Sequence, residues 1–331
     1  MSDPAPILSR QGVPDGVRVP DFFIVGHKKS GTTALHAMLS QHPEVFMPRL
    51  KEPHFLATDR RARFSNPRGG RLPETLEEYL HLFDPAAAGQ LAGEASASYL
   101  WSQTAAEGIA NLAPEARIIA ILREPASFLR SQYLQFRRIH FEDRRSMREA
   151  IALDDERRAG RKIPASCPYP QMLIYSDHVR YAEQLRRYHA RFPREQVLVL
   201  IYEEFRVDNP GTLREVARFL GIDEQFAFEE LDVNTTSKTM RSQHADDAVR
   251  SLTDGSGAAS RAARGAMRAL PKGLRRRALG SVREHLVFGA PPPVDDALMH
   301  ELRRRYRPEV EAAADYLGRD LVALWGYDQL D

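Results

Sequence analysis

Residues 26–33 combine glycine, lysine and hydroxyl side chains at a spacing suited to binding an anion. The set is Gly26, Lys28, Lys29, Ser30, Gly31, Thr32 and Thr33. An apolar run precedes this segment, and a helical pattern begins at Thr32. Such a loop directs backbone N–H groups to one point, and the helix N-terminus adds the positive end of its dipole. We therefore expect the loop to hold a phosphate or a similar anion.

The spacing of the two glycines is close to that of nucleotide-triphosphate P-loops, G-x-x-x-x-G-K-[ST]. Thr32 occupies the position after the second glycine, where those proteins have lysine, and the lysines lie inside the loop. A kinase would lack its main contact to the β- and γ-phosphates here. The alternative is an ordinary strand-to-helix turn with solvated lysines, which the density of phosphate-binding residue types disfavours.

A second group of reactive side chains follows at Lys51, Glu52 and His54. A carboxylate with a raised pKa can take a proton from a hydroxyl group, which makes Glu52 the candidate general base. His54 is the alternative base, because imidazole titrates near neutrality. Lys51 is expected to tune Glu52 or to contact an acceptor. The competing interpretation is a surface ion pair between Lys51 and Glu52, which contributes little.

Arg123 stands where an open α/β sheet binds its ligand. It directly follows an apolar, β-branched run, and ligands of open α/β sheets bind outside the carboxyl ends of strands. A guanidinium can make a bidentate, charge-assisted contact to phosphate. Ser131 lies eight residues on, about two helical turns, and could reach the same ligand. The alternative is a structural salt bridge from Arg123 to Glu124 or Glu94.

Alternating strands and helices must position these residues. Buried strands are expected at residues 22–25, 45–47, 90–95, 117–122 and 197–202. Helices are expected at 76–83, 103–112, 146–160, 171–191 and 295–317, after Pro125, and from an N-cap at Asn209 to Gly221. This order predicts an α/β fold, a P-loop-like parallel β-sheet flanked by helices on both faces, with a helical C-terminal region.

The expected organisation is a flexible N-terminal tail, residues 1–19, followed by a single domain at 20–331. Its parallel-sheet core runs to about residue 222, and after residue 223 the strand signals cease. The basic segment 261–283 has three interpretations: a solvated helical face, a patch for an anionic acceptor or lipid surface, and a nucleic-acid site. The last is disfavoured because aromatic residues do not interleave the charges.

Composition excludes several classes of protein. The chain has 331 residues and a net charge of +2, so bulk electrostatics gives no reason to expect nucleic acid as a partner. Cys167 is the only cysteine, which rules out an internal disulfide and a cysteine-based metal site. Neither a transmembrane run of about 20 apolar residues nor a secretory signal is apparent. We expect a soluble, bacterial-type cytoplasmic protein.

Three sequence motifs together resemble one enzyme family. They are Lys29-Ser-Gly-Thr-Thr-Ala-Leu35, Lys51-Glu-Pro-His-Phe55 and Arg123-Glu-Pro-x5-Ser131-x-Tyr133. The chain is similar to the sulfotransferases that use 3′-phosphoadenosine 5′-phosphosulfate (PAPS), and most similar to the carbohydrate (heparan-type) branch and its bacterial relatives. The motifs occur in family order, and with a looser C-terminal match they cover most of the chain.

The resemblance implies a role for each motif. Residues 29–33 would cradle the 5′-phosphosulfate, with Lys29 as the catalytic lysine and Lys28 in a lesser electrostatic role. Arg123 and Ser131 would bind the 3′-phosphate, and Glu52 corresponds to the catalytic glutamate. No metal ion is implied.

Two further segments resemble the family less closely. Residues 94–99 are similar to its Glu-Lys-Thr-Pro-Ser-Tyr loop but have Ala95 in place of lysine, which favours a small acceptor over a long polysaccharide. Ser98 and Tyr99 are the expected substrate contacts, with simple packing of Tyr99 as the alternative. Lys238 and Arg241 lie in a segment similar to the loop that closes on the nucleotide, and they are expected to contact the 3′-phosphate.

The leading hypothesis is therefore a PAPS-dependent sulfotransferase that forms an O-sulfate on a sugar, phenol, lipid or secondary-metabolite intermediate. One alternative is a P-loop kinase with a displaced lysine, which would need ATP and Mg²⁺. Another is a non-catalytic polyanion-binding module. The sequence leaves the acceptor and the oligomeric state open.

Overall fold

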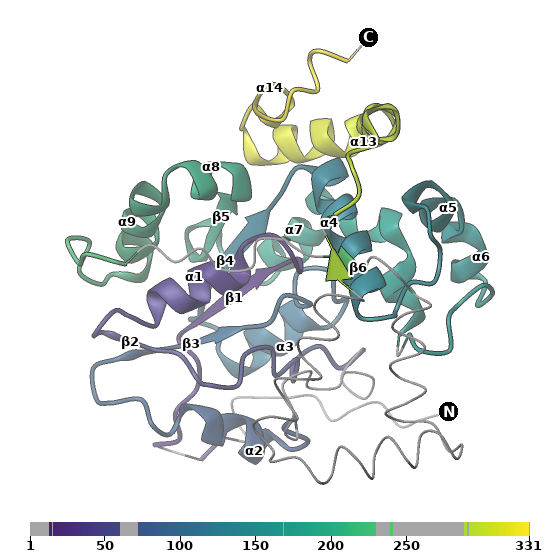
Figure 1. Cartoon of the computed structure of the whole chain (residues 1–331). Coiled ribbons are helices and arrows are strands. Elements are labelled where there is room, and N and C mark those ends of the chain that lie inside the picture. The colour runs from purple at the N-terminus through teal and green to yellow at the C-terminus, as the bar shows by residue number, and fades with distance from the viewer. Residues whose placement is uncertain are drawn as a thin grey trace, which may run out of the picture.

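Parallel strands form the sheet that positions the anion loop (Figure 1). The computed structural model describes residues 13–14, 16–59, 72–167, 169–229, 239–240, 288–289 and 291–330. In these ranges the main sheet contains β1 (Phe22–Gly26), β2 (Val45–Phe46), β3 (Leu91–Ala95), β4 (Arg117–Leu122) and β5 (Val197–Ile201). Their order is β2-β3-β1-β4-β5, and each neighbouring pair is parallel, which confirms the predicted fold class.

The two faces of the sheet are covered by different helices. Phe22 and Ile24 of β1 belong to one apolar cluster, and Phe23 and Val25 belong to the other, as the alternation of a strand requires. The first cluster is covered by α1 (Thr32–Leu39) and α9 (Asn209–Leu220). The second is covered by α3 (Ala105–Leu112), α7 (Tyr181–His189) and α13 (Asp296–Leu317).

The remaining elements surround this core. They are the α-helices α2 (Leu76–Leu80), α4 (Pro125–Arg138), α5 (Met147–Ala152), α6 (Asp154–Arg158), α8 (Tyr202–Val207) and α14 (Leu321–Leu324), the 3₁₀ turns His81–Phe83, Pro170–Leu173, Tyr175–Val179 and Arg194–Gln196, and a short antiparallel pair, β6 (Thr239–Met240) with β7 (Phe288–Gly289). This pair lies where no strand was predicted. No helix in the described ranges is both long and apolar enough to cross a membrane.

The helix predicted at 171–191 is wrong over its first half, which forms two 3₁₀ turns before α7 begins. The buried carboxylate of Asp154 explains the interruption, because it accepts hydrogen bonds from the backbone N–H groups of Tyr175 and Ser176, at 2.9 and 2.8 Å. Those amides are therefore unavailable to an α-helix. The predicted helix 146–160 is likewise divided, into α5 and α6.

Two predicted boundaries also shift. The cap of α9 is Asp208 and not Asn209, since the Asp208 carboxylate accepts from the Gly211 N–H at 2.8 Å. Strand β5 ends at Ile201, and Tyr202 opens α8 instead of closing the strand.

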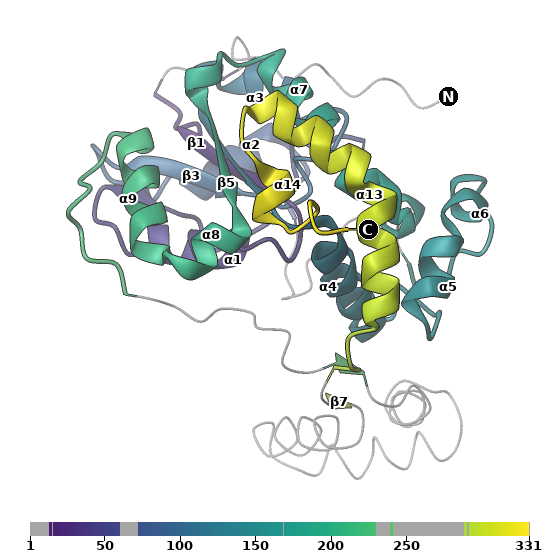
Figure 2. The same cartoon turned by 90° about the horizontal axis from the view of Figure 1, so that it is seen from above.

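The C-terminal segment packs against the tip of β4. Helix α13 runs alongside α4 and α7 (Figure 2). Beyond it, the Tyr327 hydroxyl donates to Glu124 Oε1 at 2.7 Å, and the Trp325 indole donates to Glu203 at 3.0 Å. Glu124 also caps α4 by accepting from its first amides. The C-terminal segment therefore supports the residue next to Arg123.

The predicted domain boundaries stay predictions, and Lys238, Arg241 and segment 261–283 lie outside the described residues.

Candidate functional site

The loop between β1 and α1 has a backbone conformation that few residues adopt. Lys29 and Gly31 both have positive φ angles, 75° and 93°. A Cβ atom at Gly31 would lie 3.1 Å from the Tyr202 ring and 3.3 Å from that of Phe205. Both the φ angle and the close approach therefore require glycine at position 31. Thr32 begins α1 directly afterwards, so the loop ends at a helix N-terminus as predicted.

Positive charges gather around this loop. Burial lowers the pKa of the Lys29 ammonium from its usual 10.5, and the nearby charges of Arg123 and Arg138 lower it further. The Ser30 hydroxyl is fully buried and has no hydrogen-bond partner within the described part of the chain. Clustered cations and a buried polar group without a partner fit a site for a bound anion.

Arg123 joins this cluster from the end of β4. Its Nη1 atom donates to the main-chain oxygen of Lys29 at 2.6 Å, and its guanidinium lies 4.4 Å above the centre of the Tyr202 ring. No carboxylate forms an ion pair with Arg123 in the described ranges, so the alternative salt bridges to Glu94 and Glu124 are not found there. Ser131 is buried on α4, with 7% of its surface exposed.

Glu52 lies among three basic groups. Its carboxylate is 3.0 Å from Lys51 Nζ, 3.9 Å from Lys28 Nζ and 3.5 Å from His54 Nε2. Burial raises the pKa of the Glu52 carboxyl, but these neighbours outweigh burial and hold it well below 4.5. This corrects the expectation of a raised pKa, and the carboxylate is ionised at neutral pH. Because the Lys51 side chain is only 6% exposed, its ion pair with Glu52 is not a surface pair.

His54 is a neutral neighbour of Glu52. Burial lowers the pKa of its imidazole, and contact with Glu52 opposes this only in part. Its Nδ1 atom lies 2.6 Å from Ser98 Oγ. We assign the proton to Nε2, since that nitrogen faces a carboxylate, and the Ser98 hydroxyl then donates to Nδ1. In this tautomer Nε2 carries a proton and Nδ1 accepts from Ser98. The lone pairs that can accept a proton from a substrate are therefore those of the Glu52 carboxylate.

The loop that carries Glu52 and His54 is strained. Both residues have left-handed backbones, with φ of 61° and 53°. Such a conformation costs non-glycine residues on the order of 1–3 kcal/mol each, and it persists only where surrounding contacts enforce it.

The structure places Ser98 and Tyr99 beneath this loop. Both are fully buried. The Tyr99 hydroxyl donates to Glu94 and accepts from the Leu56 N–H, at 2.8 and 3.0 Å. Neither side chain is open to solvent, and the expected contact of Ser98 and Tyr99 with a substrate stays a prediction. The placement agrees with the alternative of a packed Tyr99.

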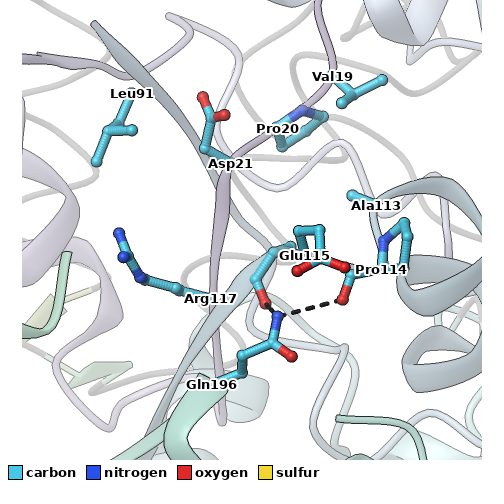
Figure 3. A pocket seen from close by; sticks show the side chains of 10 residues that line it. Val19, Pro20, Asp21, Leu91, Ala113, Pro114, Glu115, Arg117 and Gln196 are labelled. Atoms are coloured by element: carbon cyan, nitrogen blue, oxygen red, sulfur yellow. Dashed lines mark hydrogen bonds between the residues drawn. The ribbon is translucent and has the colours of Figure 1, made fainter. Parts of the chain in front are cut away.

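A cavity of about 600 Å³ lies elsewhere (Figure 3). Its lining includes Asp21, which precedes β1, and Arg117, which begins β4, so it adjoins the amino ends of the strands. The anion loop and Arg123 lie at the carboxyl ends. The cavity is therefore separate from the cluster of cations.

A model of the sulfotransferase family matches residues 20–226, which is more than half of the chain. The chain belongs to the sulfotransferase family. The match begins just before β1 and ends after α9, so it includes the anion loop, the loop of Glu52 and the tip of β4.

Individual sulfotransferases agree with this assignment. Mouse carbohydrate sulfotransferase 15 (Mus musculus) is 31% identical over 250 residues, covering 62% of this chain and 44% of its own. Mouse bifunctional heparan sulfate N-deacetylase/N-sulfotransferase 4 (Mus musculus) is 29% identical over 231 residues, covering 68% of this chain and 24% of its own. The chain thus spans less than half the length of these relatives. The crystal structure of a sulfotransferase from Alicyclobacillus acidocaldarius has a TM-score of 0.64 and 26% identity, covering 93% of this chain and 99% of its own.

Sequence reasoning missed two features of this sulfotransferase site. Arg138, at the end of α4, acts on Lys29, although the two are far apart in the sequence. Glu94, at the end of β3, is a buried partner of Tyr99. The position of Glu94 at the carboxyl end of an apolar strand could have indicated a place near the site. Nothing in the sequence spacing of Arg138 indicated that it lies near the anion loop.

Proposed function

We propose that this sulfotransferase uses PAPS as its donor and forms an O-sulfate on a hydroxyl of a small-molecule, glycoside or lipid acceptor. The observation that carries the proposal is the bond between Arg123 and the Lys29 carbonyl. It joins two cationic positions, at the tips of neighbouring strands, into one site. A nucleotide with anionic groups at its 5′ and 3′ positions matches such a pair.

The donor, when bound, supplies a sulfuryl group attached to its 5′-phosphate. In this proposal the loop amides and the hydroxyls of Ser30, Thr32 and Thr33 orient the phosphosulfate. The Lys29 ammonium stabilises negative charge on the bridging oxygen as the S–O bond breaks. Arg123, supported by the Tyr202 ring, holds the 3′-phosphate, and Ser131, Lys238 and Arg241 are further candidates for that contact.

Glu52 is proposed as the general base. The acceptor oxygen attacks sulfur in line with the breaking bond, and its proton passes to the Glu52 carboxylate. The ionised state of Glu52 supports this role, as does the tautomer of His54 that directs an N–H toward it. The basic groups that keep Glu52 charged also make it a weaker base, so positioning must supply much of the rate. His54 remains the alternative.

The acceptor is proposed to be small. Ala95 leaves the site without the lysine of the heparan-type loop, and its side chain is buried. A cytoplasmic location, a bacterial origin, a role in secondary metabolism and independence from metal ions stay predictions.

The test is incubation with PAPS and a panel of sugar, phenol and lipid alcohols, followed by mass spectrometry. We expect a sulfated product with one acceptor class and matching release of 3′-phosphoadenosine 5′-phosphate (PAP). We also expect PAP to raise the melting temperature without Mg²⁺. Stabilisation by ATP only when Mg²⁺ is present, with no effect of PAP, would contradict the proposal and favour the kinase hypothesis.

A further inference from the structure

The loop of Glu52 is attached through alternate amides to the last residue of β3 and to the segment that follows it. The N–H groups of Glu52, His54 and Leu56 donate respectively to Ala95 O, Ser96 Oγ and Tyr99 Oη, at 3.0, 3.1 and 3.0 Å. The two residues with left-handed backbones are thus each fixed at their own amide. The bond from Leu56 to Tyr99 closes the loop on its far side.

The Tyr99 hydroxyl accepts from the loop because of where its proton points. A phenol has one proton, and that of Tyr99 is donated to Glu94 Oε2 at 2.8 Å. The oxygen lone pairs are therefore free to face the Leu56 N–H. Without the carboxylate, the hydroxyl proton is free to rotate toward the loop. The O–H of Tyr99 and the N–H of Leu56 would then be two donors facing each other, with no hydrogen bond between them. Glu94 is fully buried, so in the folded protein this acceptor is a protein group and not bulk water.

We propose that Glu94 is a positioning residue for the transfer reaction, acting through the Tyr99 hydroxyl to hold the loop of Glu52 and His54 in its strained conformation. The expected effect of Glu94 on turnover rests on the proposed function. Its expected effect on the conformation of the loop does not. Within the described residues no hydrogen bond or ion pair joins Glu94 to Glu52, Lys29 or Arg123, so it is not itself a catalytic residue.

A matched pair of variants separates this role from general stability. Tyr79 and Tyr99 both donate to the same oxygen of Glu94 at 2.8 Å, and both are fully buried. Burial raises the pKa of both phenols well above 10.0, so both remain protonated donors. Of the two hydroxyls, that of Tyr99 accepts the Leu56 N–H. Tyr99→Phe and Tyr79→Phe therefore remove the same bond to Glu94, but Tyr99→Phe also breaks the link to the loop.

The first measurement is hydrogen exchange of the peptide that contains residues 52–56. We expect about tenfold faster exchange in Tyr99→Phe, the equivalent of one lost hydrogen bond, and no more than about a twofold change in Tyr79→Phe. The second measurement is turnover with PAPS. We expect kcat to fall about tenfold in Tyr99→Phe and to stay within about twofold in Tyr79→Phe, with the KM for PAPS unchanged in both. Equal effects of the two variants on exchange would overturn the proposal.

The two measurements distinguish this inference from the proposed function. Suppose that exchange is faster in Tyr99→Phe than in Tyr79→Phe, but that neither variant nor the natural protein transfers sulfate. The contact that positions the loop then stands, and the proposed function fails. If turnover is normal in Tyr99→Phe despite faster exchange, then the loop does not set the rate and the positioning role is refuted, while the proposed function stands.

Glu94→Gln tests the carboxylate directly. Burial raises the pKa of Glu94 to about 7, against the lowering effect of hydrogen bonds with Ser96, Tyr99 and Tyr79 and of the charge of Lys51. The Tyr188 hydroxyl of α7 also interacts electrostatically with it. Glutamine keeps an oxygen that accepts from both phenols but does not ionise. An ionised acceptor binds more strongly, so loop exchange in the natural protein should slow as pH rises through about 7. After correction for the intrinsic pH dependence of hydrogen exchange, Glu94→Gln should show no such slowing near pH 7. The same slowing in both proteins would refute the role of the carboxylate.

Discussion

The Nη1 atom of Arg123 donates a hydrogen bond to the main-chain carbonyl of Lys29, across 2.6 Å. The bond joins the tip of β4 to the loop after β1, and these strands are neighbours in the sheet. It also fixes the guanidinium above Tyr202. Two residues separated by more than ninety positions in the sequence thus form one cationic surface.

Arg123→Met should weaken binding of PAP by about 10- to 100-fold, the usual loss for a charge-assisted bond to phosphate. Binding of adenosine 5′-monophosphate, which lacks the 3′-phosphate, should change by less than about threefold. Titration calorimetry measures both. Arg117→Met is the control, because Arg117 begins the same strand at its opposite end and donates to Leu220 O. Equal losses of affinity for the two nucleotides would show that Arg123 does not bind the 3′-phosphate.

Donor affinity should decline at alkaline pH. The pKa of Lys29 is lowered in the ligand-free protein, whereas a bound polyanion favours the charged ammonium. The affinity for PAP should therefore be full at neutral pH and fall as pH rises through a pKa below 10.5. Lys29→Arg, which keeps its charge, should flatten this decline. A natural protein whose PAP affinity did not change up to pH 10.5 would contradict the assignment.

Glu52→Gln and His54→Asn should separate the two candidate bases. If Glu52 is the base, Glu52→Gln lowers kcat by about 10²- to 10⁴-fold and leaves PAP affinity intact. Its pKa lies well below 4.5, so the natural enzyme should show no loss of kcat from this group as pH falls from 8 to 6. His54→Asn should then retain more activity than Glu52→Gln. If instead kcat falls in acid with a pKa below 6.5, and His54→Asn abolishes that fall, the base is His54.

The protein should lose stability in mild acid because of His27. Burial lowers the pKa of this imidazole from 6.5 to about 4, although its Nε2 atom bonds to Gln184 Oε1 at 2.8 Å. The unfolded chain takes up a proton below pH 6.5 and the folded protein does not, so stability present above pH 6.5 is lost between 6.5 and about 4. The full difference is about 3 kcal/mol.

Urea unfolding of His27→Gln checks this at several pH values. The stability of the natural protein relative to the variant should decrease as pH falls through that window. A constant difference would show that His27 is not the source.

The sheet and the anion loop were predictable because their signals are local. The apolar run before Gly26, the helix pattern after Gly31 and the strand before Arg123 each lie within one contiguous segment. Parallel strands bring their carboxyl ends to one edge, so the proximity of Arg123 to the loop follows from the fold.

The electrostatics of the site was not predictable in this way. The low pKa of Glu52 is set most strongly by its sequence neighbour Lys51, as expected, but it depends also on Lys28, which comes from a different loop. The division of the helix at 171–191 depends on Asp154, a buried carboxylate contributed by α6. Sequence spacing carries no information on such contacts, since each is created by tertiary packing. The roles assigned to the site residues remain predictions.

The central claim is that the Lys29 loop and Arg123 bind one nucleotide at its two ends. A crystal structure with PAP tests this most directly. We predict the 5′-phosphate within hydrogen-bond distance of Lys29 and the amides of the loop, and the 3′-phosphate in contact with the Arg123 guanidinium. A nucleotide bound elsewhere, or one whose 3′-phosphate points away from Arg123, would contradict the account.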